Sequence, residues 1–143
     1  MSEWTAEDRI GAGYAEHSIR VLHVEDDRAL SEMYALGLRM HGFEVLVAHD
    51  GQGAIEAALQ RAPDFVVLDV GLPDIDGLEV LDRLRADPRT ALVPVALLTA
   101  FSPTAYHERA RALGVCEVLL KPSTTPSELA AAISQHLAQA RLE

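Results

Sequence analysis

The sequence contains a single cysteine, Cys116, and few aromatic residues, which make up 5% of its 143 residues. One cysteine cannot form an internal disulfide, so the composition favours a reducing compartment such as the cytoplasm. We interpret Cys116 as a small apolar filler within a strand rather than as a reactive thiol. No apolar run reaches the length of a membrane-spanning helix, and the N-terminal residues lack the apolar core of a signal peptide. These absences predict a soluble, cytoplasmic protein.

Basic residues are also scarce. The sequence has 12 Lys and Arg residues against 22 Asp and Glu residues, which gives a formal net charge of −10. Such a surface repels the phosphates of nucleic acids and of anionic lipids, so we expect neither direct nucleic-acid binding nor membrane binding. It favours metal cations and basic patches on partner proteins. The length and the hydrophobic content of 49% suit one globular domain with a sizeable core.

Residues 1–18 show no sustained hydrophobic period, and we interpret them as an N-terminal tail that precedes one domain over residues 19–141. Beyond the tail, apolar runs alternate with amphipathic segments. The apolar runs predict five strands, within residues 19–25, 43–49, 64–69, 93–100 and 115–121. The amphipathic segments predict five helices, within residues 27–40, 50–62, 75–87, 102–113 and 125–143.

The alternation of strands and helices predicts an α/β fold. The strands are apolar along almost their whole length, which is typical of a parallel sheet with helices on both faces. We therefore expect a doubly wound five-stranded parallel sheet, with strand order 2-1-3-4-5 and five helices. The sequence ends with the fifth helix, so we expect no output domain.

Polar side chains stand where the predicted strands end. Glu25 and Asp26 follow the first strand, Asp69 ends the third, Thr99 lies at the end of the fourth, and Lys121 ends the fifth. In an open parallel sheet, ligands bind beyond the carboxyl ends of the strands. Carboxylates that crowd together there require a cation or a proton, and ligands that are all oxygen favour Mg²⁺.

Acids that hold a metal, a hydroxyl and an ammonium together form a site for a phosphoryl group. A carboxylate can itself be the nucleophile, which yields an aspartyl phosphate, while the metal and the lysine neutralise the transferring oxygens. Each residue alone also has a structural explanation. Asp27, for example, is expected to cap the first helix. The arrival of all these residues at strand ends of one sheet favours the site.

Four motifs follow one another along the sequence: VLHVEDD, VVLDVGLPDIDG, the LLTA that contains Thr99 and the LLKP that contains Lys121. Together they closely resemble the CheY-like receiver domain of bacterial two-component response regulators. This resemblance implies a flavodoxin-like fold and reversible phosphorylation of Asp69 by a histidine kinase or a phosphotransfer protein. It also implies Mg²⁺ held by Asp26, Asp69 and the backbone carbonyl of Gly71, with Glu25 acting through water. Thr99 and Lys121 are expected to contact the phosphoryl oxygens, and Lys121–Pro122 is a candidate cis peptide.

The resemblance implies a signalling domain rather than an enzyme, one that at most catalyses its own phosphorylation and dephosphorylation. We therefore expect a stand-alone response regulator or phosphorelay protein that signals through phosphorylation-dependent protein–protein contacts. The expected output surface comprises helix 104–113, strand 116–121 and helix 126–140. Receiver domains usually carry an aromatic switch residue three positions before the lysine, and here that position is Val118. Phe101 and Tyr106 are the candidates to take the place of the missing ring.

Two alternatives stay open. A degenerate receiver would act as a docking module without phosphorylation, and Val118 is the feature that favours it. A Mg²⁺-dependent phosphohydrolase of the haloacid-dehalogenase type would also form an aspartyl phosphate. Such enzymes place a second acid two residues after the nucleophile, where this sequence has Gly71. Among the other acids of that segment, we expect Asp74 to be a solvated loop residue and Asp76 to shape the turn into the third helix.

Overall fold

The computed structural model describes residues 18–100 and 104–142. The predicted N-terminal tail therefore lies outside the described residues, apart from Ser18. The predicted start of the fourth helix at residues 102–103 and the role suggested for Phe101 also lie outside them.

The described residues form five strands, which alternate with five α-helices. Their bounds are β1 (Arg20–Val24), α1 (Arg28–Met40), β2 (Glu44–Ala48), α2 (Gly51–Arg61), β3 (Phe65–Leu68), α3 (Gly77–Ala86), β4 (Val95–Thr99), α4 (Thr104–Ala112), β5 (Glu117–Leu120), the 3₁₀ turn η2 (Lys121–Ser123) and α5 (Pro126–Leu142). All strand pairs are parallel and the strand order is β2-β1-β3-β4-β5. The predicted doubly wound, flavodoxin-like fold is confirmed.

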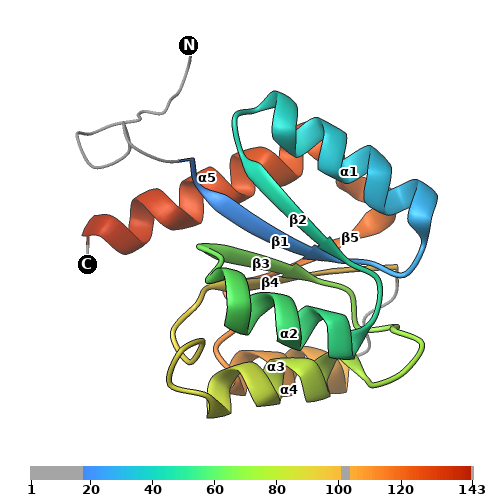
Figure 1. Ribbon diagram of the computed structural model, residues 1–143, viewed down its shortest axis with the longest axis vertical. Helices are drawn as coiled ribbons and strands as arrows, with labels where there is room; N and C mark the ends of the chain where they lie inside the picture. The colour runs from blue at the N-terminus through green and yellow to red at the C-terminus, as the bar shows by residue number, and fades with distance from the viewer. Residues whose placement is uncertain (1–17, 101–103, 143) are drawn as a thin grey trace.

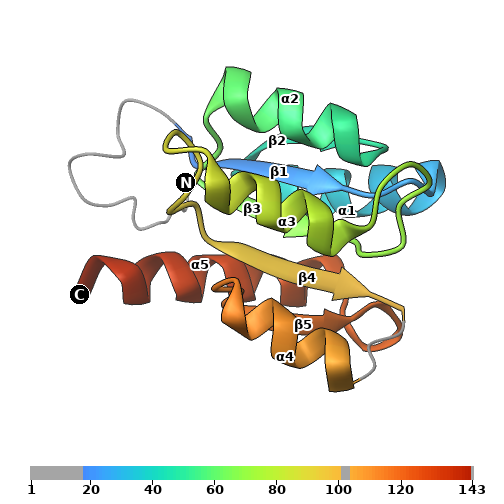
Figure 2. The ribbon, with the colours of Figure 1, turned by 90° about the horizontal axis from the view of Figure 1, so that it is seen from below.

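The helices form two layers, one on each face of the sheet. Figure 1 shows α1 and α5 on one face, and Figure 2 shows α2, α3 and α4 on the other. Each layer buries its own apolar cluster. Leu38, Leu129 and Ile133 lie between the sheet and the first layer with no exposed surface. The sheet is therefore buried on both sides, as its apolar strands require.

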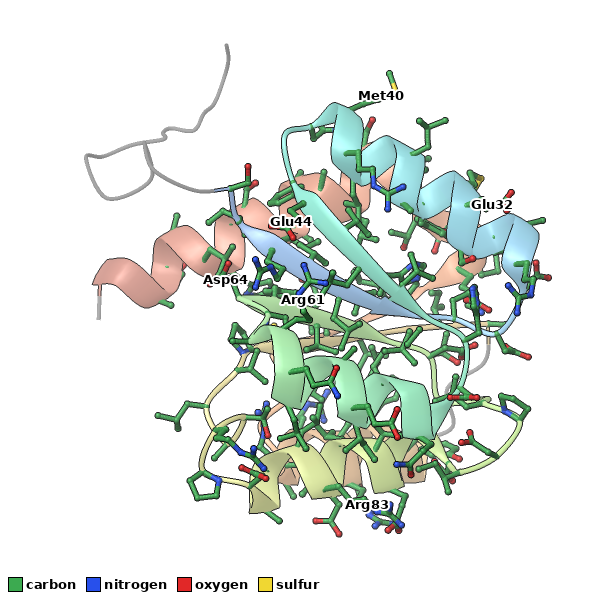
Figure 3. All side chains as sticks on the ribbon, viewed as in Figure 1. Glu32, Met40, Glu44, Arg61, Asp64 and Arg83 are labelled. Carbon is green, nitrogen blue, oxygen red and sulfur yellow. The ribbon has the colours of Figure 1, made fainter. Side chains whose placement is uncertain are left out.

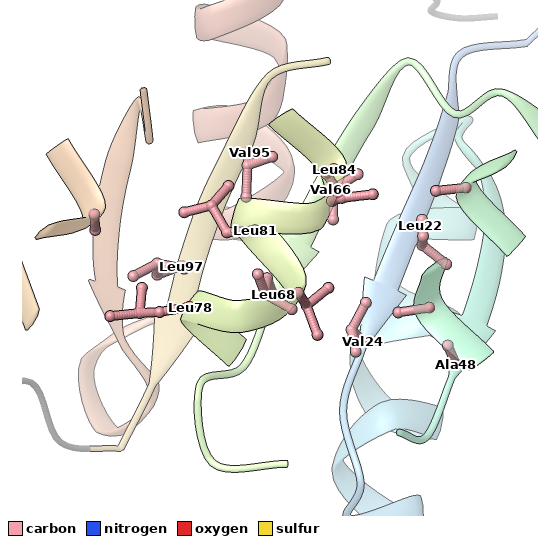
Figure 4. Packing of buried hydrophobic residues seen from close by; sticks show 14 residues of the cluster. Leu22, Val24, Ala48, Val66, Leu68, Leu78, Leu81, Leu84, Val95 and Leu97 are labelled. Carbon is pink, nitrogen blue, oxygen red and sulfur yellow. The ribbon is translucent and has the colours of Figure 1, made fainter. Parts of the chain in front are cut away.

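The second layer packs α3 directly on the centre of the sheet. Leu81 has no exposed surface and Leu84 is 1% exposed, and both lie against residues of β3 and β4, such as Val66 and Val95 (Figure 4). Because the side chain of a fully buried leucine contributes about 1.5–3 kcal/mol, this contact fixes α3 firmly against β3. The loop between β3 and α3 is thus anchored at both of its ends.

Side-chain caps and glycines set the helix ends. The carboxylate of Asp27 accepts a hydrogen bond from the Leu30 backbone N–H at 3.0 Å, so the predicted cap of α1 is confirmed. Asp50 caps α2 in the same way, accepting from Gly53. After α1, Gly42 has φ of +93°, a conformation that glycine adopts without steric cost.

Charged residues hold the strands together at their amino-terminal ends, along one edge of the sheet. Glu44 of β2 forms ion pairs with Arg20 at 3.1 Å and with Arg61 at 3.4 Å. The Asp64 carboxylate accepts a hydrogen bond from the Arg20 backbone N–H at 2.7 Å. Figure 3 labels Glu44, Arg61 and Asp64 close together at this edge. The other edge, where the strands end, carries the polar residues singled out in the sequence.

Two details of the predicted fifth strand are wrong. Cys116 is exposed and lies just before β5 rather than inside a buried strand, because β5 is an edge strand and its residues are only partly covered. The Lys121–Pro122 peptide is trans, since the described residues contain no cis peptide bond. Pro122 instead lies in the 3₁₀ turn η2, where the first turn tolerates proline. Within the described residues, no helix is both long enough and apolar enough to cross a membrane.

Candidate functional site

Strand register brings the predicted acids together. Val24 of β1 lies opposite Leu68 of β3, so Glu25 and Asp69 are the next residues on two neighbouring strands. The backbone pairing continues beyond the strands, because the Asp69 N–H donates to the Val24 carbonyl at 3.1 Å. Glu25 is 1% exposed and Asp69 is 6% exposed. Both carboxylates are therefore held in a largely buried position at the carboxyl edge of the sheet.

Lys121 joins these two acids. Its ammonium lies 2.6 Å from Glu25 Oε1 and 3.0 Å from Asp69 Oδ2, and only 15% of its side chain is exposed. Leu120, the residue before it, lies opposite Thr99 in the β4–β5 pairing, and Thr99 is 3% exposed. Thr99 thus ends the strand that lies between β3, which leads to the predicted acceptor Asp69, and β5, which leads to the predicted lysine.

Burial and pairing act on the charges in opposite directions. Burial raises the pKa of Glu25, although hydrogen bonds from Lys121 and from the Asp27 backbone N–H partly offset the effect. Burial alone would lower the pKa of Lys121, but hydrogen bonds to Glu25 and Asp69 outweigh it and the pKa is raised. The lysine therefore remains an ammonium at neutral pH, ready to face a group that carries negative charge.

A third acid completes a cluster that fits a metal ion. One carboxylate oxygen from each of Glu25, Asp26 and Asp69 lies within 4.8 Å of the others, and Asp26 is exposed to solvent. Among the described residues, the Lys121 ammonium pairs with Glu25 and Asp69, and Asp26 adds a third carboxylate, so a divalent cation would balance the remaining charge. The donor atoms are all oxygen, which suits a hard ion such as Mg²⁺. The predicted acidic residues therefore fit the predicted metal.

The loop between β3 and α3 is shaped by close backbone contacts. The Gly71 N–H donates to Asp69 Oδ1 at 3.1 Å, which orients the carboxylate. A Cβ atom added to Gly77 would lie 2.4 Å from the Val70 Cα and 2.6 Å from the Asp69 carbonyl oxygen. Only glycine permits this approach, so Gly77 fixes the path of the chain immediately after Asp69.

We expect Gly77→Ala to lower the free energy of unfolding by about 2–3 kcal/mol, because backbone atoms cannot move aside as a flexible side chain can. Gly71→Ala is the matched control. An added Cβ there meets only Asp69 Oδ1, at 3.9 Å, so its cost is expected to stay below about 1 kcal/mol. Urea unfolding followed by circular dichroism measures both values. Equal costs for the two variants would contradict this account of the loop.

Asp74 is an exposed loop residue, as the sequence suggested, but it also has a structural role. Although exposed, its carboxylate accepts hydrogen bonds from the backbone N–H groups of Gly51 at 2.8 Å and Gln52 at 3.0 Å. These two bonds lower the pKa of Asp74. From the loop between β3 and α3, Asp74 thus adds a second side-chain cap to the start of α2. Asp76 caps α3 through Leu78 at 2.8 Å, as expected of a residue that shapes this turn.

Val118, at the position of the missing aromatic switch residue, and Tyr106, one of its two expected substitutes, lie against the same apolar cluster. Val118 is half-buried and packs against the apolar cluster beneath α2, α3 and α4. Tyr106 of α4 packs on the same cluster, and its hydroxyl donates to Asp76 Oδ2 at 2.9 Å. The start of α3 and the first turns of α4 are therefore linked by a side-chain hydrogen bond beside the site.

Sequence reasoning missed His23, which is buried two residues before Glu25. The imidazole is 1% exposed, and within the described residues no hydrogen-bond partner of its Nδ1 is found. Its ring packs edge-on against Tyr34, with ring centroids 5.6 Å apart. Burial lowers the pKa of His23 to about 4, and Lys121 contributes in the same direction. The alternating pattern of a strand does not reveal such a residue, because both faces of this sheet are covered.

His23 is expected to make the fold sensitive to acid. Its pKa is about 4 in the folded protein and 6.5 when unperturbed, so the unfolded chain binds more protons between these values and stability falls as the pH falls. The His23 contribution over this window is about 3 kcal/mol. Urea unfolding at several pH values should show a weaker pH dependence for His23→Leu than for the wild type. The same pH dependence in both proteins would contradict the assignment.

Comparisons with known proteins agree with this geometry. The family model of the response regulator receiver domain matches residues 21–134, and the chain belongs to this family. It is 38% identical over 111 residues to the DNA-binding dual master transcriptional regulator RpaA of Synechocystis sp., covering 78% of this chain and 46% of that protein. The chain spans about a third to a half of the length of curated relatives that it matches.

Solved structures show the same fold. A CheY-like response regulator receiver domain protein from Methanospirillum hungatei superposes with a TM-score of 0.81 at 21% identity, covering 86% of this chain and 96% of that one. The chemotaxis protein CheY4 of Vibrio cholerae superposes with a TM-score of 0.78 at 26% identity, covering 83% of this chain and 98% of that one. The chain is thus a receiver domain in fold as well as in sequence.

Proposed function

We propose that this receiver domain accepts a phosphoryl group on Asp69 from a histidine kinase or a phosphotransfer protein. The observation that carries the proposal is the shared lysine, since the Lys121 ammonium lies 3.0 Å from Asp69 Oδ2 and 2.6 Å from Glu25 Oε1. A buried carboxylate beside an ammonium is suited to phosphoryl transfer, because the ammonium can neutralise the negative charge that the phosphoryl group adds.

The Asp69 carboxylate acts as the nucleophile. One of its oxygens attacks phosphorus, a new O–P bond forms, and the bond from phosphorus to the donor breaks with its electron pair going to the donor. A phosphohistidine donor leaves as histidine and takes up a proton, whereas acetyl phosphate leaves as acetate. Lys121 neutralises charge on the phosphoryl oxygens, and the Thr99 hydroxyl donates a hydrogen bond to one of them.

Glu25, Asp26 and Asp69, with the backbone carbonyl of Gly71, would hold the metal. Mg²⁺ bound there supplies positive charge to the phosphoryl oxygens during transfer. The positions of Glu25 and Asp69 do not depend on the ion, because both residues are buried at the ends of β1 and β3. Lys121 meanwhile offsets part of their mutual repulsion.

Signalling then proceeds through other proteins. Thr99 and Lys121 lie at the ends of β4 and β5, so their contacts with a phosphoryl group would act on the surface that comprises α4, β5 and α5. The Tyr106–Asp76 hydrogen bond connects α4 of this surface to the start of α3 and gives α4 a side-chain contact that can change. Relatives such as RpaA, which is named as DNA-binding, are longer than this chain. The stand-alone state expected from the sequence therefore stays a prediction.

The complete set of site residues argues against a degenerate docking module. A phosphohydrolase is disfavoured by Gly71, which offers no second acid, and by membership of the receiver family. The proposal is tested by incubating the protein with acetyl phosphate and Mg²⁺ and recording its intact mass. We expect the mass of one phosphoryl group to be added, and no addition when EDTA removes the metal. A protein whose mass does not change with Mg²⁺ present would be a docking module instead.

A further inference from the structure

The side chain of Tyr34 connects α1 to the segment that carries Lys121. Tyr34 is 2% exposed, and its hydroxyl donates a buried hydrogen bond to the Thr124 backbone carbonyl at 2.6 Å. Thr124 is three residues after Lys121, in the connection between β5 and α5, and directly follows the 3₁₀ turn η2. Through this hydrogen bond, the Tyr34 hydroxyl is linked to the connection that carries Lys121 rather than to Asp69 itself.

The connection itself is short and internally bonded. The Thr124 hydroxyl donates to the Leu120 carbonyl at 2.8 Å, and the Thr124 N–H donates to the Lys121 carbonyl at 3.3 Å. Residues 121–123 form the 3₁₀ turn η2. Because the two ends of this turn are bonded to each other, a side chain that holds Thr124 in place also restrains the backbone of Lys121.

Tyr34 is in turn held from two sides. Its ring packs against His23 of β1, the strand that leads to Glu25. One turn further along α1, a Cβ atom added to Gly37 would lie 2.3 Å from the Pro126 Cβ, so α1 closely contacts the first residue of α5. The Tyr34 hydroxyl therefore stands at a fixed distance from both the central sheet and the start of α5.

We propose that Tyr34 is a positioning residue for phosphoryl transfer, and that its hydroxyl holds the β5–α5 connection so that the Lys121 ammonium faces Asp69. The inference rests on the proposed function. A lysine side chain has many rotamers, and its usefulness to a phosphoryl group depends on how well its backbone is fixed. Tyr34 supplies a restraint from a helix far away in sequence, whose packing does not involve the phosphoryl group.

This role predicts a loss of affinity for a phosphoryl group without a loss of affinity for Mg²⁺, whereas a general loss of stability would lower both. The predicted metal ligands, Glu25, Asp26, Asp69 and Gly71, lie after β1 and β3, and none belongs to the β5–α5 connection. Loosening that connection should therefore weaken contacts to a phosphoryl group without weakening metal binding. Beryllofluoride, which mimics a phosphoryl group on an aspartate, reports the first property, and Mg²⁺ alone reports the second.

The test compares Tyr34→Phe with the wild type. Phenylalanine keeps the ring against His23 and removes only the hydroxyl. We expect beryllofluoride affinity at saturating Mg²⁺, followed by fluorine NMR, to fall about fivefold to tenfold, the effect of losing one buried hydrogen bond. Mg²⁺ affinity, measured by calorimetry, should not fall by more than about twofold. The initial rate of labelling by acetyl phosphate should fall together with the beryllofluoride affinity.

Thr90→Val is the matched control. The Thr90 hydroxyl donates an equally buried hydrogen bond to a backbone carbonyl, that of Leu84 at 2.7 Å, in the connection between α3 and β4. This variant should lose stability and keep its beryllofluoride affinity. If Tyr34→Phe binds beryllofluoride as the wild type does, or if both variants weaken it equally, Tyr34 has no positioning role although the proposed function stands. If the wild type itself neither binds beryllofluoride nor is labelled, the proposed function fails and this inference fails with it.

A second variant covers the case in which Tyr34→Phe does not fold. Gly37→Ala keeps the hydroxyl but places a methyl group against Pro126, which pushes the start of α5 away from α1. We expect the same selective loss of beryllofluoride affinity, with Mg²⁺ affinity preserved. Unchanged beryllofluoride affinity in a folded Gly37→Ala protein would overturn the inference.

Discussion

Asp69→Asn is expected to abolish labelling by acetyl phosphate, with a rate at least about 100-fold below that of the wild type. The amide has nearly the shape of the carboxylate, so the loop after β3 should keep its path. It lacks the negatively charged oxygen that attacks phosphorus. It also leaves the Lys121 ammonium with Glu25 alone as its close acidic partner. Intact-mass spectrometry over a time course in acetyl phosphate and Mg²⁺ measures the rate.

The matched control lies in the same loop. Asp74→Asn changes an aspartate whose carboxylate bonds to the backbone of Gly51 and Gln52 and lies outside the cluster of acids. Its labelling rate should stay within about twofold of the wild-type rate, whereas its stability should fall because α2 loses part of its cap. Equal labelling of Asp69→Asn and the wild type would mean that another residue accepts the phosphoryl group.

Lys121→Ala is expected to slow labelling by about 100-fold, the effect of removing one preorganised charged donor. The Lys121 ammonium contacts both Glu25 and Asp69 in the structure, so its loss also leaves two buried carboxylates without their common partner. Unlike Asp69→Asn, this variant retains the nucleophile, and slow labelling should still reach one phosphoryl group per chain. The time course distinguishes a slow reaction from an absent one.

The same variant should bind Mg²⁺ more tightly. In the wild type, the ammonium competes with the cation for the carboxylates, and two unit charges about 4 Å apart still interact by roughly 4 kcal/mol at an effective dielectric constant of 20. We expect an affinity increase of roughly tenfold by calorimetry. A weaker affinity would mean that Lys121 orders the acidic cluster rather than competing with the metal.

The fold and the core of the site could be predicted because they depend on local patterns. Apolar runs of strand length mark the sheet, and a parallel sheet brings the ends of its strands to one edge. Glu25, Asp69 and Lys121 each follow such a run, so their meeting follows from topology alone. Asp27 was recognised as a cap because its partner is only three residues away.

Other contacts could not be predicted, because they leave no pattern in the neighbouring sequence. Asp74 bonds to residues 22 and 23 positions away, and Tyr34 bonds to a carbonyl 90 positions away. Such partners depend on how a loop or a helix is packed, which the periodicity of the sequence does not specify. Cys116 was misplaced for a related reason, since the same apolar pattern serves a central strand and the beginning of an edge strand.

Trapping the acyl phosphate tests the central claim most directly. Sodium borohydride reduces an aspartyl phosphate to homoserine, so the labelled residue can be found by peptide mass spectrometry after incubation with acetyl phosphate and Mg²⁺. We predict homoserine at position 69 and at no other aspartate, and none in a sample prepared with EDTA. Homoserine at Asp26 or Asp74, or label that stays on a residue other than Asp69, would contradict the assignment of Asp69 as the phosphoryl acceptor.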